Sequence, residues 1–110
     1  MLPKSNRLKS DEDFKNVFKN GKTSENQFFR VKFLKNQKNL SRFGFIISTK
    51  LLKKAVSRNI FKRRLRVICR SLLQDLKSNF DIVIWPKTNS ISLNYRDLAD
   101  YLRELMISIA

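Results

Sequence analysis

A chain of 110 residues with 42% hydrophobic residues and nine Phe is long enough for one domain and too apolar to remain disordered. Its 24 Lys and Arg against nine Asp and Glu give a net charge of +15, which points to a polyanionic partner, with nucleic acid the first to consider. Because the chain has no His and a single Cys, His-dependent catalytic triads, zinc sites and internal disulfides are excluded.

The lone Cys69 suits a reducing compartment, so we expect a cytoplasmic protein. The basic N-terminus has no apolar run behind it, and no window approaches the ~18 uninterrupted apolar residues of a membrane span. We therefore expect neither a signal peptide nor a membrane-spanning helix.

Residues 10–20, SDEDFKNVFKN, are predicted to form a short helix. A serine begins it as an N-cap, acids follow in the first turn where the helix dipole favours them, and a glycine ends it. Phe14, Val17 and Phe18 fall at i, i+3 and i+4 and share one face. Burial in the core is the ordinary explanation of such a stripe; the alternative is an open cleft in which the rings stack on unpaired bases.

Two strands are predicted next, over residues 27–35 and 42–48. In the first strand apolar and basic side chains alternate, which predicts one apolar face and one basic face. The apolar face carries Phe29, Val31 and Phe33, and the basic face carries Arg30 and Lys32. The polar turn between the strands favours an antiparallel hairpin.

The second half of the chain is predicted to be helix, strand and helix, over residues 55–76, 80–86 and 92–109. The strand is apolar nearly throughout and is expected at the centre of a sheet, and Asn94 is a candidate cap of the last helix. The order α, β, β, α, β, α predicts an α+β sandwich in which three helices pack on one mostly antiparallel sheet of about four strands. The whole chain, residues 1–110, is expected to be a single domain.

Residues 53–70, KKAVSRNIFKRRLRVICR, hold eight Lys or Arg and no acid. At about 100° per residue, one side of this helix is apolar and the neighbouring side, over roughly 140°, is polar and basic. The polar side is predicted to contain Arg58, Asn59, Lys62, Arg63, Arg66 and Arg70, with Lys53 and Lys54 ahead of it. A solvated helix face is the ordinary explanation of a charge run, but such faces mix Glu with Lys, and the acids are missing here. We therefore predict that this face binds a polyanion.

Two other side chains receive a structural interpretation. Cys69 falls on the apolar side of the basic helix and is expected to pack as a small hydrophobe. Trp85, beside Pro86, is predicted to be an anchor of the core or of the sheet edge in preference to a stacking platform.

Four stretches together resemble the bacterial ribonuclease P protein subunit over nearly the whole chain. They are RLKSDEDFKNVFKNGK at 7–22, RFGFIIS at 42–48, KAVSRNIFKRRLR at 54–66 and FDIVIWP at 80–86. In order and spacing they are similar to the family's N-terminal helix, Arg-x-Gly strand, Arg-Asn-Arg helix and late apolar strand.

The resemblance implies a left-handed crossover around the basic helix and a protein that binds a catalytic RNA and helps it cleave the 5′ leader from precursor transfer RNA. The RNA would perform the hydrolysis with Mg²⁺, so no catalytic residue, metal site or cofactor is expected on the protein, and no membrane or small-molecule partner. The resemblance assigns RNA contacts to Arg58, Asn59, Lys62, Arg63 and Arg66. It assigns the leader cleft to Phe14, Phe18, Arg30 and Lys32.

The sequence departs from the family pattern in three places. Ile60 occupies the third position of the Arg-Asn-Arg motif, so one expected RNA contact is missing or is taken over by Arg63 or Arg64. The glycine expected just before the basic helix is absent, and Lys32 stands where many relatives carry an aromatic residue. Leader binding is therefore expected to depend more on charge than on stacking.

Three other functions compete with this interpretation. A structural RNA-binding module, such as a ribosomal protein, would bind RNA without affecting cleavage of precursor transfer RNA. A DNA-binding protein would read base edges, although no helix-turn-helix pair precedes the basic helix. A binder of anionic membranes is disfavoured, because the apolar sides of both long helices are needed for the core.

Overall fold

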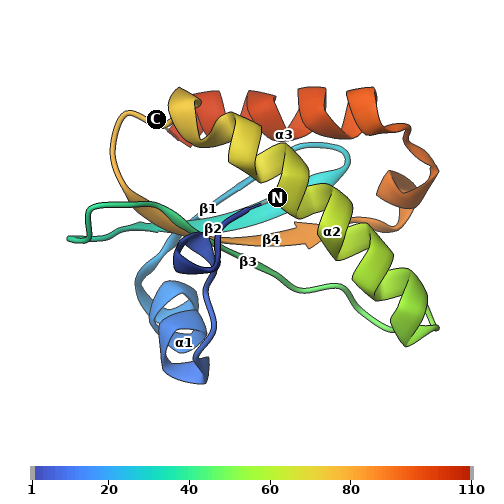
Figure 1. Ribbon diagram of the computed structural model, residues 1–110, viewed down its shortest axis with the longest axis horizontal. Coiled ribbons are helices and arrows are strands. Elements are labelled where there is room, and N and C mark those ends of the chain that lie inside the picture. Colours follow the sequence, from blue (N-terminus) through green and yellow to red (C-terminus); the bar gives the residue numbers. More distant parts are fainter. Residues whose placement is uncertain (1, 110) are drawn as a thin grey trace.

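A computed structural model describes residues 2–109 and arranges them as helices on both faces of one sheet (Figure 1). The helices are α1 (Asp11–Asn20), α2 (Ala55–Leu72) and α3 (Tyr95–Ile109). The strands are β1 (Lys22–Glu25), β2 (Phe29–Lys35), β3 (Arg42–Phe45) and β4 (Phe80–Pro86). Short 3₁₀ turns are η1 (Lys4–Asn6), η2 (Leu73–Asp75) and η3 (Thr88–Ser92). The predicted α+β class is confirmed, and β1 is an addition to the predicted elements.

The four strands form a mixed sheet in the order β1-β2-β4-β3. β2 is antiparallel to β1 and β4, whereas β3 runs parallel to β4. The predicted hairpin between the second and third strands is therefore wrong, because β4 lies between them. β4 takes the central place because it is apolar toward both faces, with Ile82, Val83 and Ile84 fully buried.

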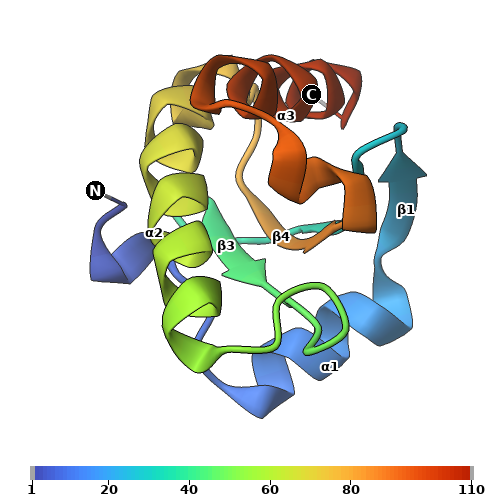
Figure 2. The ribbon, with the colours of Figure 1, turned by 90° about the vertical axis from the view of Figure 1, so that its right-hand side faces the viewer.

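The chain passes from β3 to its parallel neighbour β4 through α2. α2 and α3 cover one face of the sheet and α1 covers the other (Figures 1 and 2). In Figure 2, α2 rises at the left beside the edge strand β3 and its C-terminal half passes above the sheet, so the β3–α2–β4 crossover is left-handed, as the resemblance implies.

Most of the core lies between the sheet and the layer formed by α2 and α3. The buried residues that α2 contributes are Phe61, Leu65, Ile68, Cys69 and Leu72. Phe29 and Val31 of β2 face the same cluster, so the predicted apolar face of this strand is confirmed. Burial raises the pKa of the Cys69 thiol well above its ordinary value, and the prediction that this side chain packs as a small hydrophobe is confirmed.

Both predicted N-caps are present. The Oγ of Ser10 accepts a hydrogen bond from the backbone N–H of Asp13 at 3.1 Å, and Oδ1 of Asn94 accepts one from the N–H of Asp97 at 2.9 Å. α2 ends at Leu72, earlier than predicted, because the chain tightens there into the turn η2. Among residues 2–109, no helix has the length and apolar character needed to span a membrane.

Gly21 ends α1 for a reason other than a left-handed backbone, since its φ is −79°. A Cβ at this position would lie 2.5 Å from the carbonyl oxygen of Val17 in α1 and 3.0 Å from that of Phe33 in β2. The close approach of the helix end to β2 therefore requires glycine. β1 follows directly, and its sequence KTSE has no apolar alternation because an edge strand of this kind has little to bury.

Candidate nucleic-acid interface

The two predicted RNA-binding elements, α1 and α2, border one cleft. Figure 2 shows the N-terminal half of α2 reaching past the sheet edge toward α1. The cleft has a volume of about 330 Å³, and we call it the basic cleft. Its cations are Arg7, Lys9, Lys62 and Arg66, and its apolar lining is Leu8, Phe14, Phe43, Gly44 and Phe45. No carboxylate is among these lining residues, so the cleft favours an anionic ligand.

The aromatic stripe of α1 is divided between core and cleft. Val17 is fully buried, Phe14 is half-buried, and Phe18 is 36% exposed. The ring of Phe14 rests on Gly44, because a Cβ there would lie 2.5 Å from the ring atom Cζ. The ring of Phe14 thus packs against the glycine of the Arg-x-Gly strand, beside the basic cleft. Phe18 lies further out along α1.

Arg66 is a cation of the basic cleft with a buried, unpaired hydrogen-bond donor. Its Nε is buried and has no hydrogen-bond partner among the described residues. Burial lowers the pKa of its guanidinium, and the positive charges of Arg7 and Arg63 lower it further. Such an unpaired donor in a field of like charges is stabilised when an anion enters.

Besides its predicted RNA contact, Arg58 has a structural role that the sequence does not reveal. Its Nη1 donates hydrogen bonds to the carbonyl oxygens of Leu52 and Lys53, both at 2.9 Å. These bonds hold the loop ahead of α2 against the first turn of the helix. Arg58 therefore fixes the start of a helix that lacks the expected preceding glycine, and only part of its guanidinium remains for a ligand.

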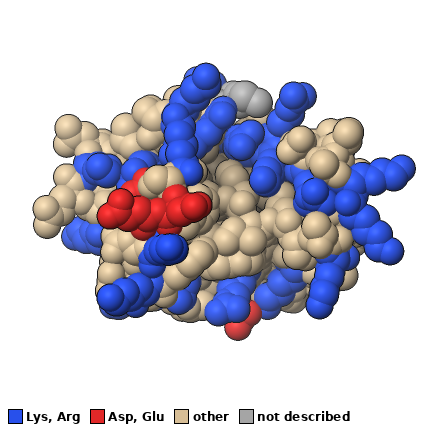
Figure 3. Space-filling model, turned by 90° about the horizontal axis from the view of Figure 1, so that it is seen from below, with Lys and Arg blue, Asp and Glu red and all other residues tan. Residues whose placement is uncertain are grey.

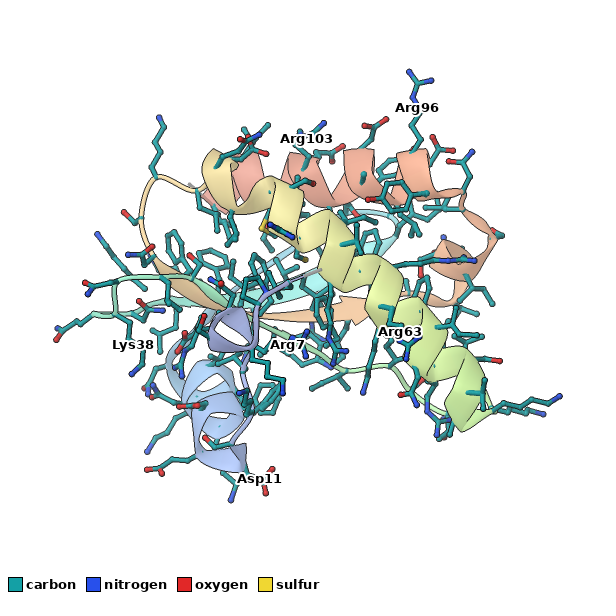
Figure 4. The ribbon with its side chains drawn as sticks, in the orientation of Figure 1. Arg7, Asp11, Lys38, Arg63, Arg96 and Arg103 are labelled. Carbon is teal, nitrogen blue, oxygen red and sulfur yellow. The ribbon has the colours of Figure 1, made fainter. Side chains whose placement is uncertain are left out.

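The remaining predicted residues of α2 form an exposed surface, which we call the outer arc. It consists of Asn59, Arg63 and Arg70 together with Lys53 and Lys54. Ile60 lies on the other edge of the helix, in a hollow that Arg64 and Ile91 also line. Arg63, labelled on α2 in Figure 4, belongs to the outer arc. Because Arg64 shares the hollow with Ile60, it lies on the edge of the helix where an arginine at position 60 would make its contact, whereas Arg63 lies on the outer arc.

Arg30 and Lys32 lie on the α1 face of the sheet, but their side chains differ in availability. Lys32 Nζ donates a hydrogen bond of 2.6 Å to the carbonyl oxygen of Phe18 and so caps the end of α1. Arg30 is exposed, and its guanidinium carbon lies 5.6 Å from the centroid of the Trp85 ring. Trp85 is half-buried at this face, which agrees with an anchoring role and adds an aromatic surface.

Arg42 fixes the position of α1 over the sheet. It forms two hydrogen bonds with the buried carboxylate of Asp81, at 2.8 and 2.6 Å, and one of 3.1 Å with Asp13 in the first turn of α1. The hydrogen bonds to Asp81 raise the pKa of Arg42 above its ordinary value. Arg42 at one end of α1 and Lys32 at the other therefore hold the helix that borders the basic cleft.

The face that α1 covers is predominantly basic (Figure 3). Lys and Arg side chains surround an area of uncharged surface, and acidic side chains gather mainly in one place. The first turn of α1 carries Asp11, Glu12 and Asp13. Over residues 2–109, no three His, Cys, Asp or Glu side chains form a group that could hold a metal ion.

Sequence reasoning missed two residues of this face, and it did not place Trp85 there. Arg7 and Lys9 lie in the segment before α1, and no local pattern connects them with Lys62 and Arg66, more than 50 residues later. The place of Trp85 on this face could have been predicted from the period of a strand, because Val83 and Trp85 are two residues apart and therefore point to the same face. Arg30 is paired with Trp85 in the register of β2 and β4 and lies on that face too.

The comparisons with known proteins agree with this geometry. The model of the Ribonuclease P family matches residues 2–110. The ribonuclease P protein component of Pseudanabaena sp. (strain PCC 6903) is 38% identical over 107 residues, which cover 96% of this chain and 92% of that protein. The RNase P protein from Thermotoga maritima has a TM-score of 0.85 at 32% identity, covering 94% of this chain and 97% of that one. For the RNase P protein of Staphylococcus aureus the TM-score is 0.82 at 26% identity, covering 96% and 95% of the two chains. The chain therefore belongs to the ribonuclease P family, whose members are RNA-binding components of an endoribonuclease of transfer RNA processing.

Proposed function

We propose that the outer arc binds the catalytic RNA of ribonuclease P and that the basic cleft receives the unpaired 5′ leader of precursor transfer RNA. The observation that carries this proposal is the buried, unpartnered Nε of Arg66 in a cleft whose lining holds four cations and no carboxylate. A phosphate would satisfy that donor and relieve the repulsion between Arg66 and Arg7. Phe14 beside it offers a surface to a base.

The catalytic centre lies on the partner RNA in this proposal. The chain has no His, and the side chains lining the basic cleft are cations and apolar groups, none of which is an ordinary general base at neutral pH. The RNA with its Mg²⁺ would supply the hydrolysis. The protein positions the leader and neutralises phosphates, and the complex acts in the cytoplasm.

Cleavage of precursor transfer RNA by the chain's own ribonuclease P RNA, with and without the protein, tests this function. The test variant is Lys62→Gln with Arg63→Gln, which removes one cation from the basic cleft and one from the outer arc. The matched control is Lys38→Gln with Arg96→Gln; Arg96 projects from α3 away from the rest of the molecule, and Lys38 lies in the loop after β2 (Figure 4).

We expect the wild type and the control to stimulate cleavage at low Mg²⁺ and the test variant to lose most of that stimulation. Equal stimulation by all three proteins would contradict the proposed sites. Tight RNA binding by the wild type without any stimulation would leave only a structural RNA-binding module.

A further inference from the structure

A stripe of aliphatic side chains runs along the edge of α2 that lies away from the basic cleft. Its members are Val56, Ile60 and Val67, which we call the apolar ridge. At about 100° per residue they fall within roughly 40° of one another, about 120° from the buried side of the helix. Beside the ridge is a hollow of about 170 Å³, which Ile60, Arg64 and Ile91 of η3 line. The ridge and its hollow therefore form one continuous surface between α2 and η3.

The core does not account for the apolar ridge. Val56, Ile60 and Val67 are 69%, 49% and 41% exposed, and none belongs to the two core clusters found within residues 2–109. Such β-branched residues form helices less readily than Ala, Glu or Lys, so at exposed positions they lower the stability of the helix. One exposed aliphatic residue is ordinary, but three on one helix edge beside a hollow indicate a contact surface.

The charges around the ridge indicate the chemistry of the partner. Arg64 lines the hollow, and exposed Arg63 borders the ridge on its other side. Neither takes part in the ion pairs found within residues 2–109. α2 itself contains no acidic residue. Because an arginine pairs with a carboxylate through two parallel hydrogen bonds, a partner that covers the ridge needs carboxylates beside its apolar side chains.

Three other occupants fit this surface less well. A second copy would bring two chains of net charge +15 together, and the ridge spans only about 17 Å of helix, less than a stable dimer interface needs. Unpaired RNA bases stack on aromatic rings, whereas the ridge is aliphatic. A helix that lies in a membrane surface needs a wide apolar face, and the wide apolar face of α2 is buried in the core.

We propose that the apolar ridge and its hollow bind an acidic amphipathic helix of another protein. In this mode of recognition the bound helix presents apolar anchors at i, i+4 and i+7 to a groove. One anchor enters the hollow between Ile60 and Ile91, and carboxylates beside the anchors pair with Arg63 and Arg64. The inference does not rest on the proposed function, because the ridge lies outside the basic cleft.

A synthetic peptide tests the site. The probe is a fluorescently labelled helical peptide of Leu, Glu and Ala, with Leu at i, i+4 and i+7. The control peptide has Ala in place of each Leu and keeps every Glu. Anisotropy is measured at physiological salt, where attraction that depends on charge alone is screened. We expect the Leu peptide to bind about tenfold more tightly than the control peptide. Equal affinities, or no binding of the Leu peptide, would overturn the proposal.

Substitutions test which surface the peptide uses. Ile60→Ser removes the central side chain of the ridge without changing the charge, and we expect it to weaken binding of the Leu peptide about tenfold. The matched control is Ile107→Ser, at an aliphatic side chain 60% exposed on α3, which should leave the affinity unchanged. Urea unfolding checks that both variants are folded. An unchanged affinity in folded Ile60→Ser would contradict the proposal.

The contribution of charge has its own pair of variants. Arg64→Gln should weaken binding of the Leu peptide several-fold more than Lys38→Gln, which removes the same charge from the loop after β2. Equal effects would show that the net charge attracts the peptide and would contradict the pairing with Arg64.

Amide chemical shifts of the isotope-labelled protein locate the bound peptide. We expect the largest changes at Ile60, Val67 and Ile91. Changes confined to the basic cleft and outer arc would overturn the proposal, because the peptide would then occupy the surface that attracts polyanions. Ile60→Ser is also tested against single-stranded oligoadenylate and phosphatidylglycerol vesicles. A loss of affinity for either one, with peptide binding unchanged, would assign the ridge to RNA or to a membrane instead.

Discussion

The two faces of the sheet are used in different ways. The face toward α2 and α3 is closed, with Val31, Ile82 and Ile84 all fully buried. The face toward α1 has only a small closed core, and beyond it Phe14 and Phe18 lie beside cations. The first face stabilises the fold, and the second keeps aromatic and charged groups available. The difference predicts that substitutions on the two faces change different measured quantities.

The largest expected effect on stability is at the ion pair between Arg42 of β3 and Asp81 of β4, on the face toward α1. Replacing Arg42 with Leu leaves the carboxylate of Asp81, whose side chain is 5% exposed, without its cation. We expect a loss of about 3–5 kcal/mol in the free energy of unfolding, because an uncompensated buried charge remains. Urea unfolding measures it, and Arg42→Leu with Asp81→Leu should recover part of the loss. A double variant no more stable than the single one would contradict this explanation.

The two faces of the sheet are compared most clearly by the loss of stability when Leu65 or Phe18 is replaced with alanine. Leu65 is fully buried, so Leu65→Ala should lower the free energy of unfolding by about 2–4 kcal/mol. Phe18→Ala should lower it by less than about 1 kcal/mol, because the ring is already 36% exposed, while it weakens binding of single-stranded RNA. Equal losses of stability in urea unfolding would show that α1 covers a second full core.

A smaller effect on stability is expected at Gly44, against which the ring of Phe14 packs. Gly44→Ala places a Cβ 2.5 Å from the ring, which must swing away. We expect a loss of about 1–2 kcal/mol in the free energy of unfolding and weaker binding of single-stranded RNA. Phe14→Leu should relieve the clash, so the double variant should be more stable than Gly44→Ala alone. An unchanged free energy of unfolding in Gly44→Ala would show that the packing of Phe14 does not require a glycine at position 44.

Local periodicity predicts most elements of this fold but not their neighbours. The alternation of β2 and the helical spacing of Phe61, Leu65, Ile68 and Leu72 are properties of short segments and are confirmed. Strand order depends on which strand is apolar toward both faces. β4 takes the central place for that reason, and the turn that suggested a hairpin carries no information about it. β1 has no apolar signal at all.

The candidate site was predictable only in part for a similar reason. The charge run of α2 stands out in the sequence, so Lys62 and Arg66 could be predicted as ligands of a polyanion. Their meeting with Arg7 and Phe14 depends on the crossover, which carries α2 past the sheet edge. The hydrogen bonds of Arg58 to the loop ahead of α2 depend on the path of that loop, and no residue pattern predicts them.

The central claim is that the cations of the basic cleft and outer arc bind RNA by neutralising phosphates. The most direct test is the slope of log affinity against log salt concentration for ribonuclease P RNA. Each phosphate contact that is removed should flatten the slope by roughly one, so Lys62→Gln with Arg63→Gln should flatten it by about two. Lys38→Gln with Arg96→Gln removes the same charge and should leave the slope unchanged. Equal slopes for the two double variants would contradict the claim, because the net charge alone would then determine binding.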